Sequence, residues 1–417
     1  MSYLVVGGGV AGLVVARRLA MSGAAVTVYE SSDYAGGIVT SQTVGGLILD
    51  AGAESFATRG GTVAALATEL GLGPDIVTPL SEPAWLYRAA GEPLPLPATS
   101  VLGIPAVPLA ADVIAVVGYR AAFRAYLDVL ISDRVGRSAS SLGELVSKRM
   151  GDRMLDRLVT PVVRGVHSAH PNELELDRVA PFLRAALKSE GSLTHAVRLL
   201  RASAPAGSAI AGIRGGINRL VVELLADLSS LGVTLELNAT VSDVDANSVV
   251  VNGSRVYGEP IVAASGLLEP NDRRDITLAT LVVDVPELDA HPRGTGLLVA
   301  DGAPGIRARA LTHSTAKWSW LAERADGKHV LRLSYDGGQA SAPAAREDAA
   351  QLLGVSIPPS AVLDFAIVNW TRPAPEAPHG VTATGEAVGG SGLAAVVKHA
   401  EETAARLLDD GAGPPVG

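Results

Sequence analysis

A glycine-rich turn between an apolar strand and a helix constrains this chain more than any other feature of its sequence. Residues 3–6 are apolar and strand-like, and residues 13–22 repeat apolar positions at helical spacing before Gly23 ends the pattern. Residues 24–30 form a second apolar strand pattern. A strand, a helix and a strand in this order predict an α/β fold with a Rossmann-like parallel sheet.

The turn between the first strand and the helix has the spacing of a dinucleotide-binding loop, Gly7-x-Gly9-x-x-Gly12. Gly7 permits a tight turn, Gly9 lets a pyrophosphate approach the backbone, and Gly12 allows the helix to pack closely on the strand. The helix that follows presents free N–H groups at its N-terminus, and helix N-termini attract phosphate groups. The loop therefore predicts a dinucleotide cofactor.

Glu30 is placed to bind the ribose of that cofactor. It ends the second strand, 18 residues after Gly12, where a carboxylate can accept hydrogen bonds from ribose hydroxyls. A carboxylate here disfavours a 2′-phosphate, because two anions would face each other. The alternative is that Glu30 only caps the surface end of the strand.

Two further glycine-rich stretches distinguish FAD from NAD as the cofactor. Both cofactors bind to the strand–helix–strand unit described above, so that unit alone does not decide between them. Gly36 and Gly37 are followed by residues 44–56, which carry more glycine and end in Glu54-Ser55-Phe56. Residues 381–393 contain a third cluster that runs into a helix at 392–408. This helix offers a second N-terminus to the far end of an extended cofactor.

Composition excludes several other classes of protein. There are 34 Lys and Arg residues against 43 Asp and Glu, a net charge of −9, which disfavours nucleic-acid binding. The absence of cysteine excludes disulfides, thiolate nucleophiles and cysteine-ligated metals, and no metal site is expected. A length of 417 residues suggests two to three domains.

The chain is expected to be soluble and cytoplasmic. No signal-peptide pattern precedes the first strand. Residues 4–20 and 101–117 are apolar, but glycine, proline or charged residues interrupt both runs, so neither resembles a membrane span. Residues 109–130 form an apolar helical stripe that is expected to be core, with a substrate tunnel or peripheral membrane contact as alternatives. The oligomeric state is left open.

Six stretches in a fixed order resemble the FAD-dependent amine oxidase superfamily, and most closely its protoporphyrinogen/coproporphyrinogen oxidase branch. Each stretch is a weak signal by itself, and their shared order over most of the chain makes the resemblance specific. The stretches are Gly37–Phe56, Trp85–Pro97, Thr160–Val166, Ile213–Ile217, His313–Trp318 and Asn369–Pro375.

The resemblance implies a fold of three parts. A FAD-binding domain would comprise residues 1–75, 206–266 and 376–411, and a mixed-sheet substrate domain residues 76–100 and 267–375. Residues 101–205 would be a helical insertion and 412–417 a tail. The implied FAD contacts are Gly7, Gly9, Val10, Ala11, Gly12, Glu30, Gly36, Gly37, Gly52, Ala53, Val241, Gly385, Glu386, Gly392 and Leu393.

The chain departs from the family pattern near the expected cofactor. Ile38 and Ala51 stand where the resemblance implies basic residues, and Ala395 where it implies an aspartate. Glu386 replaces a smaller or shorter polar residue, and a helical segment between Pro375 and Gly380 is missing. These departures leave open how tightly FAD binds and which substrate is used.

Flavin chemistry requires few reactive side chains, because the cofactor accepts the hydride. Lys317 lies within one resembling stretch and is the candidate for a lysine beside the flavin, although pairing with a carboxylate is the simpler role. Arg59, Arg88 and Arg164 are candidates for binding substrate carboxylates, since a guanidinium matches a carboxylate geometrically. Each could instead be structural.

The predicted function is the FAD-dependent oxidation of coproporphyrinogen III or protoporphyrinogen IX with O2 as the acceptor. One alternative is a divergent flavin oxidase or desaturase of another small molecule. Another is a protein-binding member of the same fold that has lost the cofactor, as in the Rab escort group. The absent basic residues favour that last alternative, and the C-terminal glycine cluster opposes it.

Overall fold

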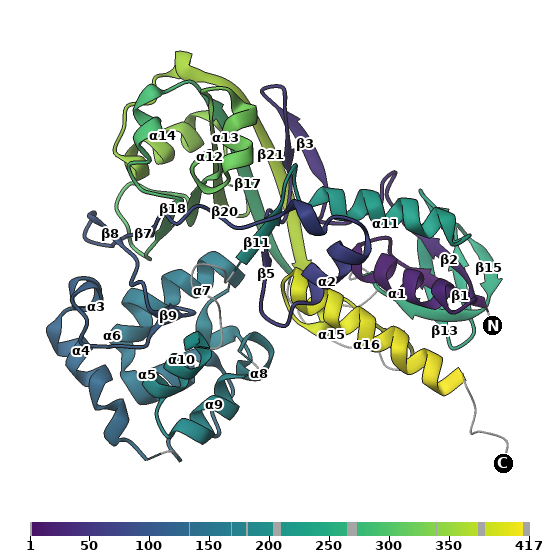
Figure 1. Cartoon of the computed structure of the whole chain (residues 1–417), viewed down its shortest axis with the longest axis horizontal. Coiled ribbons are helices and arrows are strands. Elements are labelled where there is room, and N and C mark those ends of the chain that lie inside the picture. Colours follow the sequence, from purple (N-terminus) through teal and green to yellow (C-terminus); the bar gives the residue numbers. More distant parts are fainter. Residues whose placement is uncertain are drawn as a thin grey trace.

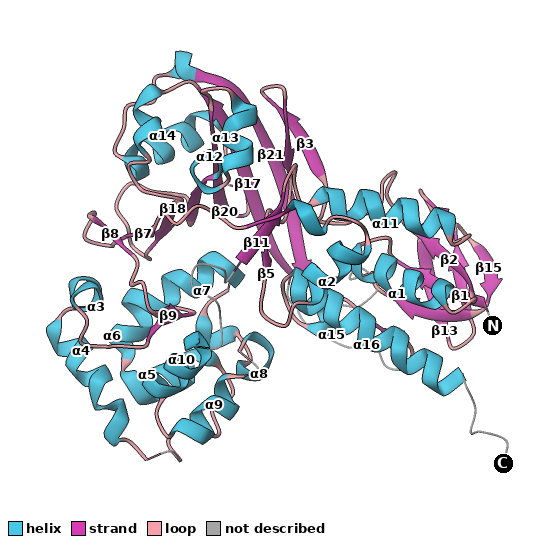
Figure 2. Cartoon of the chain, in the orientation of Figure 1, coloured by secondary structure: helices cyan, strands magenta, loops and turns pink. Residues whose placement is uncertain are grey.

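A computed structural model describes residues 2–132, 134–167, 169–180, 182–202, 210–264, 273–338, 340–373 and 380–411. Figure 1 shows a parallel-sheet region that holds the described N-terminal strand and the last helix, a large twisted sheet, and a cluster of helices. The helix and strand content in Figure 2 confirms the predicted α/β class. Several of the predicted domain limits fall at 206–209, 265–272, 374–379 and 412–417, outside the described residues.

The predicted parallel sheet is present and has five strands in the order β12-β2-β1-β16-β22. Each neighbouring pair is parallel. Segments far apart in sequence therefore meet in one sheet. The strands are β1 (Ser2–Val6), β2 (Ala25–Tyr29), β12 (Thr234–Glu236), β16 (Glu259–Val262) and β22 (Thr382–Ala383).

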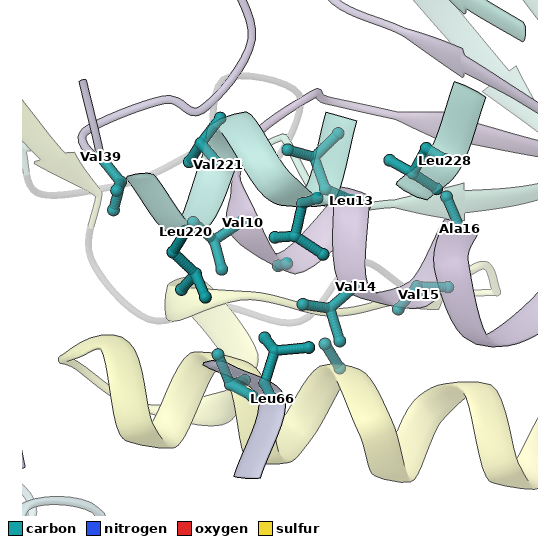
Figure 3. Close-up of a cluster of buried hydrophobic side chains, with 14 of the residues drawn as sticks. Val10, Leu13, Val14, Val15, Ala16, Val39, Leu66, Leu220, Val221 and Leu228 are labelled. Atoms are coloured by element: carbon teal, nitrogen blue, oxygen red, sulfur yellow. The ribbon is translucent and has the colours of Figure 1, made fainter. Parts of the chain in front are cut away.

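Helices cover this sheet and share one apolar core with it. They are α1 (Val10–Met21), α2 (Thr62–Glu69), α11 (Asn218–Ser230) and α16 (Leu393–Gly411). Figure 3 shows α1 between α11 and α16, with Leu13, Leu66 and Leu220 among the buried side chains of this core. The last helix continues to Gly411, so the prediction that it ends at 408 was wrong by one turn.

A three-stranded meander lies beside the parallel sheet. It consists of β13 (Val241–Asp245), β14 (Ser248–Val251) and β15 (Ser254–Tyr257), joined by tight turns. β15 was not predicted from the sequence, because Ser254 and Arg255 weaken its apolar alternation. Val241 is buried against Tyr29 and other residues of a small apolar cluster.

The second sheet has seven strands in the order β21-β17-β20-β19-β18-β7-β8. One face packs against α14 (Ala342–Leu353) through a cluster that includes Leu331 and Leu333. Two helices not anticipated from the sequence, α12 (Ser314–Lys317) and α13 (Ser319–Ala325), follow β19. The strands are β7 (Ala84–Tyr87), β8 (Pro93–Pro95), β17 (Arg273–Val283), β18 (Gly296–Val299), β19 (Ala310–His313), β20 (His329–Asp336) and β21 (Val362–Pro373).

A hairpin from the N-terminal third of the chain lies on the other face of this large sheet. It consists of β3 (Ser41–Val44) and β4 (Leu47–Asp50), joined at Gly45 and Gly46. Both glycines have positive φ, which a two-residue hairpin turn of this kind requires. The hairpin buries Val44 and Leu47 against the sheet.

Three short strands connect the regions: β5 (Phe56–Ala57), β6 (Ile76–Val77) and β11 (Ile210–Ile213) pair in the order β5-β11-β6. A small hairpin, β9 (Ser100–Val101) with β10 (Ile104–Pro105), precedes the helical region. Its helices are α3 (Ala111–Val117), α4 (Tyr119–Tyr126), α5 (Leu142–Met150), α6 (Asp152–Met154), α7 (Thr160–His167), α8 (Leu176–Val179), α9 (Leu183–Glu190) and α10 (Leu193–Ala202).

The helical region is held by its own apolar core and by one fully buried ion pair. Arg149 on α5 donates to Asp128 over 2.5 Å, and both side chains are inaccessible to solvent. Asp128 also accepts from the N–H of Thr194 on α10, so the pair ties separate helices together.

The predicted apolar stripe at 109–130 is split: Val113 and Val116 are core, whereas Tyr119 and Phe123 are exposed. Within the described ranges, no helix combines the length and apolar character needed to cross a membrane.

Candidate flavin site

The first glycine loop packs as tightly as its spacing predicts. Gly7 has a φ of 105° and donates to the carbonyl of Tyr29 over 2.8 Å. A Cβ on Gly7 would lie 2.8 Å from the backbone nitrogen of Ala264, and a Cβ on Gly12 would overlap the carbonyl oxygen of Gly7. The loop therefore has no room for side chains at these two positions.

Gly9 differs from both, because the space in front of it is open. A Cβ there would meet no described atom within 4 Å. No described side chain caps the first turn of α1, so its N–H groups face this space without a side-chain partner. An open approach to a helix N-terminus fits a pyrophosphate group.

Glu30 reaches back across this loop. Its Oε2 accepts a 2.7 Å hydrogen bond from the N–H of Gly8. Its Oε1 accepts from the N–H of Ser32 over 2.8 Å. The carbonyl of Glu30 accepts from Ala239, which brings the start of the Val241 strand to the same place. The hydroxyl of Ser31 also donates to Oε1 over 3.3 Å. Glu30 thus holds the loop, and its Oε2 retains acceptor capacity for a ribose hydroxyl.

The second glycine pair lies directly against the first loop. Gly36 donates to the carbonyl of Gly8 over 2.7 Å and forms an isolated parallel bridge with Gly9. A Cβ on Gly37 would lie 3.4 Å from the Cα of Gly9. The structure therefore brings together two stretches that the sequence linked to one cofactor.

The C-terminal glycine cluster meets the start of α1 as well. A Cβ on Gly385 would lie 3.4 Å from the Cβ of Ala11. Glu386 begins the short helix α15 (Glu386–Gly389). Gly392 accepts from the N–H groups of Ala395 and Val396 at the start of α16, directly before Leu393. A second helix N-terminus is thus available, as the sequence predicted.

The helical region contacts this C-terminal cluster at two points. Arg178 on α8 donates to the carbonyl of Ala387 over 3.0 Å. His167, at the end of α7, lies 3.0 Å from the hydroxyl of Ser391 through its Nδ1. Both contacts place polar groups of the helical region beside the glycine cluster, and neither was anticipated from the sequence.

The segment Ala51–Glu54 runs between the parallel-sheet region and the large sheet. A Cβ on Gly52 would overlap the carbonyl oxygen of Ile38, so this position requires glycine. Ala53 donates to that same carbonyl over 3.4 Å. The carbonyl of Ala51 accepts from Trp370 Nε1 and from Arg332 Nη2, each over 3.2 Å. Side chains from two strands of the large sheet, β20 and β21, therefore hold the segment through hydrogen bonds.

Glu54 is the centre of a nearly buried charge cluster. It accepts from Lys317 Nζ over 2.5 Å and from the hydroxyl of Ser314 over 3.2 Å, and Arg332 lies 3.6 Å away. Burial alone would raise the pKa of Glu54, but Lys317 and Arg332 outweigh it and lower the pKa to about 2. Lys317 is therefore engaged in an ion pair, which was the simpler of its two predicted roles.

Asp50, which the sequence analysis did not select, anchors the same segment. Its two carboxylate oxygens accept from the N–H groups of Ile217 and Asn218, each over 3.1 Å, at the N-terminus of α11. Burial raises the pKa of Asp50 to about 6, although these hydrogen bonds and Arg332 oppose the change. Its position at the end of an apolar strand, like that of Glu30, is the signal that could have identified it.

The three arginines proposed for substrate carboxylates have separate protein partners. Arg59 is exposed, donates to the carbonyl of Leu200 and lies 5.6 Å from the ring centre of Phe182. Arg88 pairs with Glu92 over 2.8 Å. Arg164 pairs with Asp301 over 2.6 Å and joins α7 to the large sheet.

Comparison with known proteins places this architecture in a family. The model of the family "flavin containing amine oxidoreductase" matches residues 10–265, more than half of the chain. Coproporphyrinogen III oxidase of Mycobacterium leprae is 28% identical over 90% of this chain and 88% of its own length. The enzyme of the same name from Propionibacterium freudenreichii is 27% identical over 79% and 71%.

A solved structure shows the same fold over nearly the whole length. It comes from Exiguobacterium sp. 255-15 and is described as a "putative protoporphyrinogen oxidase". The two structures superimpose with a TM-score of 0.80, at 20% identity, over 98% of this chain and 99% of the other. The arrangement of sheets and helices described above is therefore that of a solved fold.

Proposed function

The chain belongs to the family of flavin-containing amine oxidoreductases, and from this premise we propose that it is an FAD-dependent porphyrinogen oxidase. It is an oxidoreductase with a flavin cofactor. The proposed substrate is coproporphyrinogen III, with protoporphyrinogen IX as the nearest alternative and O2 as the electron acceptor. Relatives that align with this chain over most of their length are named coproporphyrinogen III oxidase.

The observation that carries the proposal is the meeting of three glycine stretches at the start of α1. Gly9 contacts Gly36, and Ala11 lies against Gly385, although more than 370 residues separate the last two in sequence. A protein-binding member without a cofactor would not need an uncovered backbone at Gly9 in front of the N-terminus of α1. A Cβ built on Gly9 or on Gly392 would meet no described atom within 4 Å.

Residues of this chain would hold FAD in an extended conformation. We propose that the first turn of α1 binds the pyrophosphate, that Glu30 accepts from the ribose, and that Val241 borders the adenine. Gly52, Ala53, Gly392 and Leu393 would contact the other end. When bound, FAD supplies the hydride acceptor, and the protein supplies orientation and exclusion of water.

The face of the large sheet that carries the β3–β4 hairpin also presents polar side chains beside the proposed flavin end. Arg332 and Trp370 lie on this face and bond to Ala51, and Thr280 pairs across the sheet with Arg332. The opposite face is covered by α14. We propose that the substrate binds over the first face, because it adjoins the segment that would touch the flavin.

The deciding experiment is anaerobic reduction of the FAD-reconstituted protein, followed by its absorbance near 450 nm. Coproporphyrinogen III should bleach the flavin, and admitting O2 should restore it and produce a fluorescent porphyrin. Bleaching by an amine such as putrescine, but by neither porphyrinogen, would indicate another flavin oxidase. A protein that takes up no FAD would indicate a non-enzymatic member of the fold.

A further inference from the structure

We propose that Arg332 is a positioning residue that fixes the Ala51–Glu54 segment and places its positive charge beside the bound flavin. The inference rests on the proposed function, because it requires this segment to border the cofactor. Sequence reasoning did not select Arg332, which is a single arginine within the otherwise ordinary strand β20.

The contacts of Arg332 all converge on that segment. Its Nη2 donates to the carbonyl oxygens of Ala51 and Gly52. Its Nη1 lies 3.6 Å from the carboxylate of Glu54. The side chain is only 10% exposed, so water screens these interactions weakly. A guanidinium can address two carbonyls and a carboxylate together because its five N–H groups point in fixed directions.

Strand alternation explains why the guanidinium reaches this place. Leu331 and Leu333 belong to the core cluster that includes residues of α14, so Arg332 between them faces the other side of the sheet. Its neighbours across the sheet are Thr280 and Thr312. The arginine therefore lies on the proposed substrate face and not in the core.

Arg332 contacts the backbone at Ala51, a residue whose own side chain is uncharged. Ala51 is buried, and the family resemblance implies a basic residue there. The guanidinium from β20 reaches the carbonyl of that same residue. A cation is thus present at the segment, although it comes from a strand some 280 residues later in the chain.

Four ionisable groups meet at this segment. Lys317 and Arg332 are positively charged, and both hold Glu54 ionised. Asp50 is the next carboxyl along the chain, and its pKa of about 6 leaves it largely ionised near pH 7. A cation with little solvent screening stabilises a nearby anion. Reduced flavin and its adduct with sulfite both carry more negative charge than oxidised flavin, so both should be favoured.

The test compares variants of the full chain reconstituted with FAD. Arg332→Gln removes the charge and should lower the flavin midpoint potential and weaken sulfite binding at least tenfold. Arg332→Lys keeps the charge and should leave the potential near that of the parent while weakening FAD binding. Trp370→Phe removes a neutral donor to Ala51 and should not move the potential. Arg324→Gln, on the solvent side of α13, is the matched control.

Glu54→Gln tests the same charge balance in the opposite direction. It removes one negative charge, so sulfite should bind more tightly and the flavin midpoint potential should rise. This variant keeps the inference testable if Arg332→Gln does not fold. Unchanged or weaker sulfite binding in Glu54→Gln would overturn the inference. So would a folded Arg332→Gln with the parent's potential. These readouts need no porphyrinogen, so the inference can fail while the proposed function stands. A parent that takes up no FAD would overturn both.

Discussion

Glu30 and Gly8 are joined by a 2.7 Å hydrogen bond from the backbone N–H of the glycine to the carboxylate. The bond connects the end of β2 to the loop before α1, so the carboxylate proposed to bind ribose also holds the loop that would bind pyrophosphate. A Cβ on Gly8 would lie 2.9 Å from the Cβ of Glu30, which shows how closely the two segments approach. Loss of the carboxylate should therefore affect both ends of the adenosine diphosphate site.

The first prediction concerns Glu30→Ala. We expect FAD binding to weaken by roughly ten- to a thousandfold, because one or two charge-assisted hydrogen bonds to ribose are lost at about 1.4 kcal/mol per tenfold. Fluorescence titration of the apoprotein with FAD measures the effect. Glu30→Gln retains an acceptor for Gly8 and should lie between parent and alanine variant. An alanine variant with the parent's affinity would mean that other groups hold the ribose.

The second prediction separates two glycines of one loop. Gly9→Ala should leave the stability of the apoprotein unchanged, since φ is −70° and the new Cβ meets no described atom within 4 Å. FAD affinity should still fall by about tenfold or more, because the methyl group would occupy the path of the pyrophosphate.

Gly12→Ala is its counterpart, with the opposite result. Its Cβ would overlap the carbonyl oxygen of Gly7, so we expect a loss of roughly 1–3 kcal/mol in the free energy of unfolding of the apoprotein. Denaturant unfolding of both variants without FAD provides the comparison. Equal destabilisation by the two substitutions would contradict the geometry of the loop.

The third prediction concerns the buried pair of Arg149 and Asp128 in the helical region. Asp128→Ala leaves the guanidinium buried without its carboxylate and should cost about 3–5 kcal/mol in the free energy of unfolding. Lys148→Ala removes an exposed pair with Glu144 on the same helix, α5, and should cost less than about 1 kcal/mol. Similar losses in the free energy of unfolding for both substitutions would show that the buried pair stabilises the protein no more than the exposed one.

The fourth prediction is an acid dependence from His313. Burial, together with the neighbouring His329 and His291, lowers the pKa of His313 to about 3. The unfolded chain binds a proton at this residue below about pH 6.5, whereas the folded protein resists it until about pH 3. Stability should therefore fall as the pH falls through this window.

Urea unfolding at several pH values between 7 and 4 measures this dependence. His313→Gln should flatten the curve, because the imidazole that must remain neutral is gone. The buried neighbour His329, whose pKa is also lowered chiefly by burial, should retain part of the slope. A parent whose stability is constant over the window would contradict the prediction.

Local patterns were enough to predict the first strand, helix and strand of the parallel sheet and the glycine turn between them. The loop of Gly7, Gly9 and Gly12 has a fixed spacing with a known geometry, and the second strand after it determines where Glu30 lies. β15 was not predicted, because two polar residues interrupt a strand of four.

The charge cluster of Glu54, Lys317 and Arg332 could not be predicted from local patterns. Glu54 and Arg332 are far apart in sequence and meet only because one face of β20 lies over the Ala51–Glu54 segment. Alternation along β20 indicates that residue 332 faces away from Leu331 and Leu333, but not what covers that face. Such pairings depend on how the two sheets pack, which no single stretch of sequence encodes.

The order of the parallel sheet has a consequence for synthesis of the protein. β1 pairs with β16 some 250 residues later, and β16 in turn pairs with β22 near residue 382. Helix α16, the last described helix, covers α1. The first strand and helix therefore leave the ribosome long before their partners exist, and their apolar surfaces must stay soluble meanwhile. Folding of this region should be slow and dominated by loop closure, and a chain cut before residue 382 should aggregate.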